Sequence, residues 1–177
     1  EQRVELEASP WRTRADRTRT EQAWFPCTHL DLGGGLGIRY VAEDAPPPVR
    51  EYADTLLRLI GSRPHRLLVE PGRSLVGNAG ALLARVECIK HNTGRSFAVV
   101  DAAMNDLIRP ALYDAHHEIL PVRAPAAGSM LTADIVGPVC ESGDWLGRDR
   151  ALVVQSGDLL AVLSTGAYCM SMASNYN

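Results

Sequence analysis

The chain has 177 residues, enough for one ordinary domain or for parts of two, and its 46% hydrophobic and 22% charged residues indicate a globular protein. A formal net charge of -3 gives no reason to expect a nucleic-acid partner, because binding to phosphates needs a clustered basic surface. The apolar runs are too short to span a bilayer, and the N-terminus has no apolar signal core. We therefore expect a cytoplasmic protein without membrane association.

The four cysteines are widely spaced and include no C-x-x-C pair: Cys27, Cys88, Cys140 and Cys169. This spacing argues against a zinc knuckle or a disulfide scaffold and fits reduced thiols. Lysine is scarcer still, since Lys90 is the only lysine of the chain.

Residues 1–27 have neither helical nor strand periodicity, and residues 11–20 are basic and polar. We expect a disordered arm or a damaged or foreign segment, with a nucleic-acid-binding arm as an alternative. Organised sequence begins with a short apolar strand at 29–32, which runs into Gly33-Gly34-Gly35.

An amphipathic helix is predicted after the prolines at 46–48, with a stop at Gly61. Its apolar positions recur at helical spacing: Val49, Ala53, Leu56, Leu57 and Ile60. A second buried strand follows at 66–70 and is broken by Pro71-Gly72. The order of strand, glycine turn, helix and strand is typical of a βαβ unit, with functional loops at the carboxyl ends of its strands.

The pattern changes near residue 80. Ala84, Val86 and Cys88 alternate with more polar neighbours, which predicts a half-buried strand. Further strands are expected at 97–101, 118–122, 134–139, 151–154 and 159–163, with a short helical stretch within 107–116. The sequence therefore predicts α/β structure at 28–80 and a mostly antiparallel β domain at 81–177.

Two motifs end the predicted strands of the α/β part. Glycines at 33–35 let backbone N–H groups approach a phosphate, although a tight turn would use the same residues. In Glu70-Pro71-Gly72-Arg73, the guanidinium is presented at a strand end, where it can bind a carboxylate or a phosphate. A surface turn with a solvated arginine is the alternative.

The β domain holds a second group of candidates. Arg109 precedes a proline, and Tyr113 follows one helical turn later, so the two can face the same way. His116 and His117 are adjacent, which is not the spacing of a metal site, and we expect surface histidines and no metal.

Cys140 lies beside two carboxylates in a glycine-flanked loop that contains Glu141 and Asp144. Neighbouring anions disfavour a thiolate, so this cysteine suits a proton donor better than a nucleophile. A small buried cysteine at a strand end is the alternative. Tyr168 lies in a run of small, polar and aromatic residues that can line a pocket.

The residues of these motifs and their order along the chain resemble those of one family. L-D-L-G-G-G-L-G-I, E-P-G-R, D-A-A-M-N-D-L-I-R-P-A-L-Y, G-P-V-C-E-S-G-D and G-A-Y followed by S-M-A-S-N-Y-N are similar to the later motifs of diaminopimelate decarboxylases. The resemblance covers residues 29–177, whereas residues 1–27 show none.

The resemblance implies the C-terminal part of a (β/α)8 barrel that binds pyridoxal 5'-phosphate (PLP), followed by a β-sandwich or β-barrel domain. It implies a homodimer with active sites at the subunit interface. Around the cofactor it places Gly33, Gly34, Gly35, Glu70, Gly72, Arg73 and Tyr168. For the substrate it implies Arg73, Arg109, Tyr113, Glu141 and Tyr168, with Cys140 as the acid and with Cys140 and Glu141 contributed across the interface.

The implied reaction is the decarboxylation of meso-2,6-diaminopimelate to L-lysine and CO2 in lysine biosynthesis. The distal end of this amino acid needs a cation for its carboxylate and an anion for its ammonium, which arginines and Glu141 supply. Related decarboxylases for ornithine or arginine resemble this chain less, because a C-D-G-type loop is expected there in place of C-E-S-G-D.

The cofactor-anchoring lysine of the family is expected upstream of the glycine run, where this sequence contains none. We therefore expect a truncated copy that is inactive by itself. Three alternatives remain open: a non-catalytic paralogue that regulates the full enzyme by mixed dimerisation, a decarboxylase for another basic amino acid, and a free-standing β-domain binding module.

Overall fold

The structure, a computed structural model, describes residues 28–124 and 129–176, so the expectations for residues 1–27 lie outside the described residues. Its residues form two compact groups. The first, here called the βαβ unit, has residues 28–38 and 45–74 among those described. The second, here called the sheet unit, has residues 39–44 and the described residues from 75 onward.

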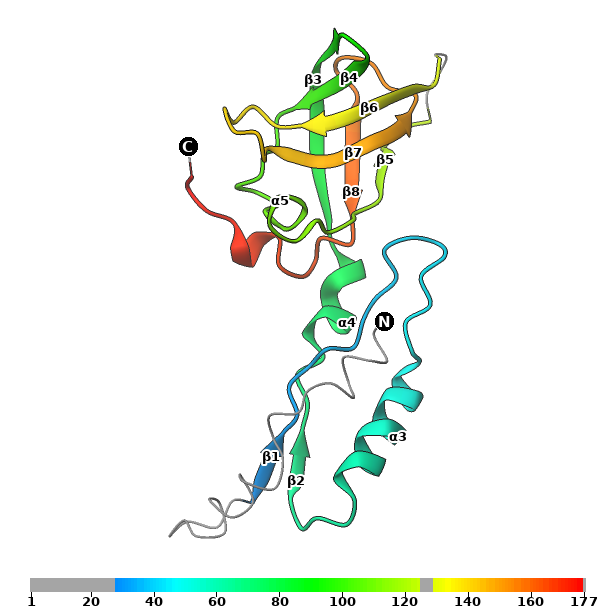
Figure 1. The fold of residues 1–177 in the computed structure, drawn as a ribbon, viewed down its shortest axis with the longest axis vertical. Helices are drawn as coiled ribbons and strands as arrows, with labels where there is room; N and C mark the ends of the chain where they lie inside the picture. The colour runs from blue at the N-terminus through cyan, green and yellow to red at the C-terminus, as the bar shows by residue number, and fades with distance from the viewer. Residues whose placement is uncertain (1–27, 125–128, 177) are drawn as a thin grey trace. The chain divides into compact units, whose positions relative to one another are not determined.

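The βαβ unit contains two parallel strands joined through a helix, as the sequence predicts (Figure 1), but the buried strand expected at 66–70 is shorter and its Leu68 is 45% exposed. Strand β1 (His29–Asp31) pairs with β2 (Arg66–Leu68), and Leu30 lies opposite Leu67. Helix α3 (Val49–Ile60) begins after Pro48 and ends before Gly61, whose φ of 64° suits a residue without a side chain.

The buried face of α3 differs from the predicted one. Tyr52 is the buried residue of the helix, whereas Val49 and Leu57 of the predicted apolar stripe are 69% and 57% exposed. Within the βαβ unit the helix has only a two-stranded sheet beside it, which is too small to cover a full apolar stripe. Periodicity therefore predicted the helix correctly but not which of its residues are covered.

The sheet unit has one six-stranded sheet in the order β5-β8-β3-β4-β6-β7. Its strands are β3 (Ala81–Asn92), β4 (Arg95–Val100), β5 (Ile119–Pro121), β6 (Leu131–Val136), β7 (Trp145–Leu152) and β8 (Leu159–Leu163). The pairs are antiparallel except for β4 and β6, so the predicted antiparallel character is confirmed with one parallel exception.

The sheet curls into a nearly closed barrel. Strands β6 and β7 cross in front of β3, β4 and β8, and the two edge strands β5 and β7 contact each other (Figure 1). The interior is filled by apolar side chains from every strand, including Val86, Val100, Ile119, Ile135, Leu146 and Leu160. The predicted inward positions Ala84 and Val86 are 1% and 0% exposed, as their alternation indicates.

Two predicted strand ranges were displaced. The strand expected at 134–139 is β6 and ends at Val136, because the next residues enter a loop. The strand expected at 151–154 is the end of β7, which begins at Trp145. Charged residues at 148–150 interrupt the apolar pattern of β7, and Asp149 has a φ of 52°, so alternation fails there.

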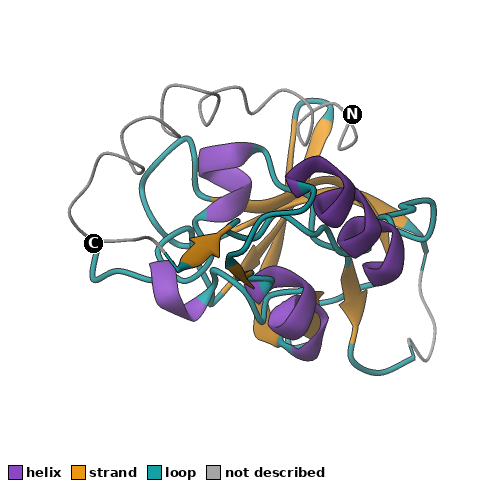
Figure 2. Ribbon diagram, turned by 90° about the horizontal axis from the view of Figure 1, so that it is seen from below, coloured by secondary structure: helices purple, strands orange, loops and turns teal. Residues whose placement is uncertain are grey.

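Short helical turns connect the strands; helices are purple in Figure 2, and the longest described helix by its bounds is α3. They are α4 (Gly72–Val76), the 3-10 turn η1 (Gly77–Ala79), α5 (Arg109–Tyr113) and the 3-10 turn η2 (Met170–Met172). The predicted helical stretch within 107–116 is thereby confirmed. In the described part of the chain, no helix is long and apolar enough to cross a membrane.

Two glycines allow a close backbone approach at the end of β8. A Cβ on Gly166 would collide with the carbonyl oxygen of Val76, and a Cβ on Gly80 would lie 2.5 Å from Gly166 Cα. Two backbone hydrogen bonds fix this approach: the Thr165 N–H donates to Gly80 O at 3.1 Å, and the Gly166 N–H donates to Gly77 O at 3.0 Å.

We expect Gly166→Ala to lower the free energy of unfolding by about 3 kcal/mol, because the added methyl group meets rigid backbone. Urea unfolding followed by circular dichroism measures this loss. Gly143→Ala is the matched control, since its Cβ would meet no atom closer than 3.9 Å. Equal effects of the two substitutions would contradict the close-approach explanation.

Candidate functional site

Three loops that carry predicted site residues follow strands of the same direction. Strand β4 is parallel to β6, and β4 and β8 are both antiparallel to β3. Arg109 follows β4, Cys140 and Glu141 follow β6, and Tyr168 follows β8. These residues therefore project from the carboxyl ends of three strands with a common direction, the region where loops of a β scaffold commonly carry function.

Arg109, at the start of α5, contacts two tyrosine rings. Its guanidinium carbon is 5.7 Å from the ring centre of Tyr113 and 5.2 Å from that of Tyr168. The residue is only 9% exposed, and its Nε is buried with no hydrogen-bond partner among the described residues. Stacking on two rings orients a cation for a planar anion, and Arg109 and Tyr113 face each other as their spacing predicts.

Cys140 and Glu141 lie exposed in the loop 137–143 between β6 and β7. The loop packs beside α5, because the position of a Cβ on Gly143 is 3.9 Å from the Ala111 Cβ. Asp144 closes the loop as a buried residue, with a carboxylate that accepts hydrogen bonds from two backbone N–H groups. The alternative of a buried structural cysteine does not fit the exposed Cys140.

The end of the described chain folds back onto the turn before α5. The Ser174 N–H donates to Asn105 O at 3.0 Å, and the Cys169 thiol donates to Asp106 O at 3.3 Å. Tyr176 donates its hydroxyl proton to Glu141 Oε1, and this hydrogen bond with the charge of Glu141 raises the pKa of Tyr176. Sequence reasoning missed Tyr176, because no local pattern links residues 35 positions apart.

His117 corrects the expectation of surface histidines, because its side chain is 0% exposed. Its Nδ1 lies 2.9 Å from Leu163 O and donates there, which leaves Nε2 buried without a partner among the described residues. The edge of the Tyr40 ring packs on it. Burial lowers the pKa of His117 most, and the nearby cations of Arg109, His116 and Arg150 lower it further against the opposite effect of the Leu163 carbonyl.

The other predicted group lies in the βαβ unit. Gly33 and Gly35 have φ values of 68° and 104°, and a Cβ on either would meet nothing within 4 Å. A Cβ on Gly34 would collide with Glu70 O, and Glu70 donates its N–H to Gly33 O at 2.8 Å, so the glycine run lies against the Glu70 turn. Tyr52 supports this turn by donating its hydroxyl to Gly34 O at 3.0 Å.

The remaining predicted residues of the βαβ unit follow directly. Gly72 is exposed at the start of α4, and its N–H donates to Glu70 O at 2.8 Å. Arg73 is half-buried in the same helix. The glycine run and the E-P-G-R turn thus meet, as their positions at the ends of two neighbouring parallel strands predict.

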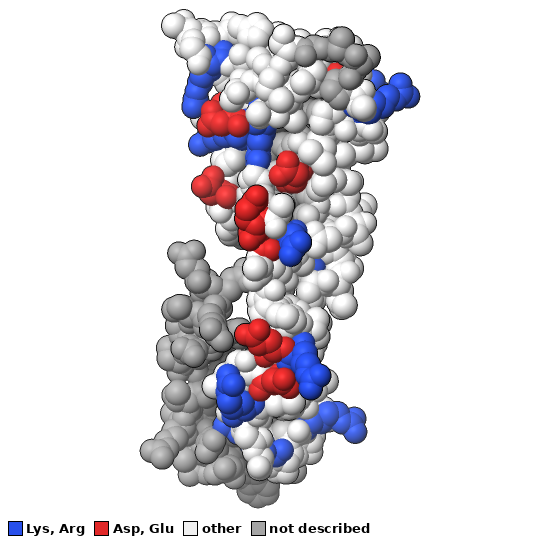
Figure 3. Space-filling view, turned by 90° about the vertical axis from the view of Figure 1, so that its right-hand side faces the viewer, with Lys and Arg blue, Asp and Glu red and all other residues white. Residues whose placement is uncertain are grey.

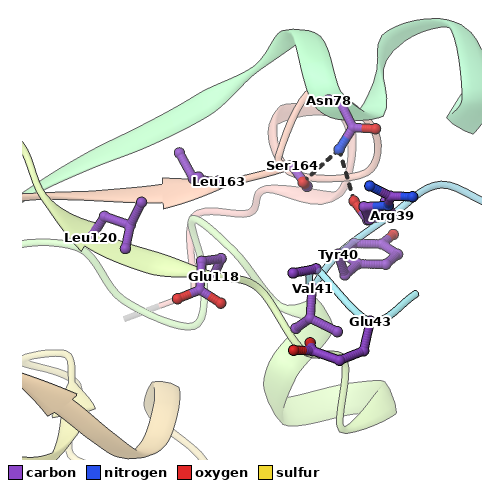
Figure 4. A pocket seen from close by; sticks show the side chains of 10 residues that line it. Arg39, Tyr40, Val41, Glu43, Asn78, Glu118, Leu120, Leu163 and Ser164 are labelled. Atoms are coloured by element: carbon purple, nitrogen blue, oxygen red, sulfur yellow. Dashed lines mark hydrogen bonds between the residues drawn. The ribbon is translucent and has the colours of Figure 1, made fainter. Parts of the chain in front are cut away.

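A separate cavity of about 680 Å³ opens in the sheet unit (Figure 4). The Asn78 amide bridges two of its walls, since it donates to Arg39 O at 3.0 Å and to Ser164 Oγ at 2.7 Å. None of the predicted site residues lines it; the lining residues are Arg39, Tyr40, Val41, Ala42, Glu43, Asn78, Glu118, Leu120, Leu163 and Ser164. This cavity is therefore distinct from the predicted site.

Charged side chains of both signs are interspersed on the face drawn in Figure 3. Over residues 28–124 and 129–176, no group of three or more histidine, cysteine, aspartate or glutamate side chains is arranged to hold a metal ion. The predicted site residues of the sheet unit supply a guanidinium, tyrosine hydroxyls, a carboxylate and a thiol.

The chain belongs to the pyridoxal-dependent decarboxylases: the model of their C-terminal sheet domain matches residues 16–166. The match starts at residue 16, within residues 1–27, for which the motifs show no resemblance. Among individual proteins, the diaminopimelate decarboxylase of Neisseria meningitidis serogroup A is 59% identical over 149 residues, which are 84% of this chain and 36% of that enzyme.

Solved structures agree with this assignment. A crystal structure of a protein from Aquifex aeolicus is 46% identical and superposes with a TM-score of 0.81 over 92% of this chain and 40% of that one. The diaminopimelate decarboxylase of Helicobacter pylori, solved in complex with L-lysine, is 38% identical with a TM-score of 0.75, over 83% of this chain and 36% of that one. The chain thus spans well under half the length of these relatives.

The burial of His117 predicts how the free energy of unfolding depends on pH. The pKa of His117 in the folded protein lies below the ordinary 6.5. As the pH falls below 6.5, the unfolded chain therefore binds a proton at His117 that the folded chain does not bind. The free energy of unfolding is therefore expected to fall from pH 7.5 to pH 5.5, as measured by urea unfolding.

His117→Asn should weaken this pH dependence, because the asparagine amide can still donate a hydrogen bond but does not titrate. His91→Asn is the matched control, since His91 is exposed. A pH dependence unchanged by His117→Asn would show that other groups cause it.

Proposed function

We propose that the chain is the C-terminal part of a PLP-dependent diaminopimelate decarboxylase, which converts meso-2,6-diaminopimelate to L-lysine and CO2 in cytoplasmic lysine biosynthesis. The observation that carries the proposal is the Arg109 guanidinium in contact with the rings of Tyr113 and Tyr168, with the Cys140–Glu141 loop packed beside the same helix. The 59% identity to a diaminopimelate decarboxylase supports it.

The residues of the βαβ unit fit the phosphate of PLP. The backbone at Gly35 has open space where a side chain would stand, so an anion can approach it closely, whereas the Gly33 N–H already donates to Asp31 Oδ1 at 2.8 Å. Glu70, Gly72 and Arg73 lie on the neighbouring turn, and Arg73 supplies a cation. When bound, PLP supplies an electron sink for the electrons left by the departing CO2.

The sheet unit supplies groups that suit the distal end of the substrate. Arg109 has an unpaired buried Nε and can bind a carboxylate, while Tyr113 and Tyr168 keep its guanidinium plane in place. The Glu141 carboxylate binds the distal ammonium group. Ornithine lacks a distal carboxylate, so a site that combines Arg109 of one subunit with Glu141 of the other favours diaminopimelate over ornithine.

Cys140 is the proposed acid that protonates the α-carbon after CO2 leaves. Its thiol is exposed at the tip of a loop, where it can reach a group outside its own chain. We propose that Cys140 and Glu141 complete the active site of a partner subunit in a homodimer, and that Tyr168 contacts PLP. We further propose that β1, α3 and β2 belong to a (β/α)8 barrel, which would cover the exposed Val49 and Leu57.

Two alternatives to the proposed function can be tested. A non-catalytic paralogue that forms mixed dimers has no need of an exposed Cys140 thiol or of the Arg109 site. The activity of the hybrid enzyme described below distinguishes such a paralogue from a decarboxylase. A decarboxylase for another basic amino acid would prefer lysine or ornithine over diaminopimelate in the same assay.

Lys90 is not expected to anchor PLP. It lies exposed on β3 opposite Phe97, in the sheet unit. The family's lysine is expected upstream of the glycine run instead. Mixing the full chain with PLP, reducing with borohydride and mapping peptides by mass should give no stoichiometric lysine adduct, with at most weak labelling of Lys90 or the N-terminal amine. A saturable Lys90 adduct that diaminopimelate displaces would contradict the proposal.

The activity is tested in a hybrid enzyme. The aligned 149 residues of this chain replace their counterparts in the Neisseria meningitidis enzyme, which keeps its own remaining sequence. We expect the hybrid to release CO2 and L-lysine from meso-diaminopimelate. Cys140→Ala in the hybrid should lower kcat about 100-fold, because the positioned acid is lost.

Cys88→Ala is the matched control, since Cys88 is a half-buried thiol of β3 outside the site loops. A hybrid that is folded and binds PLP but releases no CO2 would contradict the proposed function. Equal activities of the two cysteine variants would contradict the role of Cys140 alone.

A further inference from the structure

We infer that Asp144 is a positioning residue whose carboxylate fixes the Cys140–Glu141 loop to the turn that precedes Arg109. The inference deepens the proposed function and rests on it for the roles of Cys140 and Glu141. The contacts of Asp144 themselves are independent of any assigned reaction.

The Asp144 carboxylate joins two segments that are distant in sequence. Its Oδ1 accepts the Met104 N–H at 2.7 Å, and its Oδ2 accepts the Val139 N–H at 2.6 Å. The residue is 4% exposed, so water does not compete for these hydrogen bonds. Each oxygen of one side chain therefore holds a different segment, one from the loop and one from the turn.

The loop is folded around this residue. The Asp144 N–H donates to Glu141 O at 3.1 Å, and the Gly137 N–H donates to Asp144 O at 3.2 Å. A Cβ on Gly137 would lie 2.5 Å from Asp144 Oδ2, so the carboxylate fills the space that a side chain would need. Cys140 and Glu141 lie between these anchor points.

The turn on the other side is equally well defined. Asp106 Oδ2 accepts the Ala103 N–H at 2.9 Å, and the Leu107 N–H donates to Ala103 O at 3.1 Å. Arg109 follows two residues after Leu107, which is fully buried. Asp144 thus connects the loop to a rigid segment that leads directly into the guanidinium site.

Such an anchor is needed because Cys140 and Glu141 are both exposed and are not held by burial. Reacting groups must be placed to within a fraction of an ångström, and small displacements cost large factors in rate. In a dimer with shared sites, Cys140 and Glu141 of a subunit would lie in its partner's active site and Arg109 in its own. Asp144 would connect these two groups of residues.

Amide hydrogen exchange of the full chain, followed by NMR, tests the anchor directly. Asp144→Asn leaves only one acceptor oxygen for two N–H donors, so exchange at Val139 or Met104 should accelerate about tenfold or more, with Ile135 of β6 unchanged. Gly137→Ala should accelerate the same amides, because its methyl group would collide with the Asp144 carboxylate and with Ala102 O.

Asp134→Asn is the matched control, since Asp134 is 7% exposed and accepts the Asp149 N–H within β6 and β7, outside the 137–143 loop. It should leave exchange at Val139 and Met104 unchanged. Unchanged exchange in Asp144→Asn overturns the inference. Loss of the circular dichroism of the sheet in Asp144→Asn also overturns it, because Asp144 would then hold the fold rather than the loop.

The hybrid enzyme supplies the functional readout. Asp144→Asn should raise KM for diaminopimelate about tenfold while PLP content and circular dichroism stay constant, whereas partial unfolding would lower kcat at constant KM. An unchanged KM overturns the positioning role. Inactivity of the unsubstituted hybrid would contradict the proposed function alone, because amide exchange in the chain still decides whether Asp144 anchors the loop.

Discussion

The sheet unit depends on one long strand that changes partners along its length. Residues Ala81–Arg85 of β3 pair with β8, and from Val86 onward the strand pairs with β4, with a register irregularity between Val86 and Cys88. An irregularity of this kind bends a strand and increases its twist. The bend lets one strand serve both halves of the sheet, so that the edge strands β5 and β7 meet and enclose the apolar core.

The position of the candidate site follows from that closure. Strands β4, β6 and β8 share a direction, so the loops after them leave the barrel from their carboxyl ends. Buried polar groups then connect the loops to the sheet: Asp144 joins the β6–β7 loop to the turn after β4, and His117 joins the segment after α5 to Leu163 at the end of β8. Stacking of Arg109 against Tyr168 connects the β4 and β8 loops.

The apolar core cluster of the described residues lies in the sheet unit, although both units also have exposed apolar residues. In the sheet unit, Leu107, Ile135 and Leu160 are fully buried, as expected for a nearly closed barrel. In the βαβ unit, Val49 and Leu57 of α3 stay exposed beside a two-stranded sheet. The location of this cluster agrees with a sheet domain that forms its own core, and the exposed apolar residues of α3 motivate the proposal that the βαβ unit belongs to a (β/α)8 barrel.

The sequence by itself determined the βαβ order, the helix at 49–60, the half-buried β3 and the family, because these depend on local periodicity and on contiguous motifs. Only the tertiary structure decided that His117 is buried, that Asp144 bridges two loops and that Tyr176 donates to Glu141. It also decided that Tyr52 is the fully buried residue of α3, while Val49 and Leu57 of the predicted apolar stripe are exposed. These features depend on contacts between segments far apart in the chain, and local patterns carry no information on such contacts.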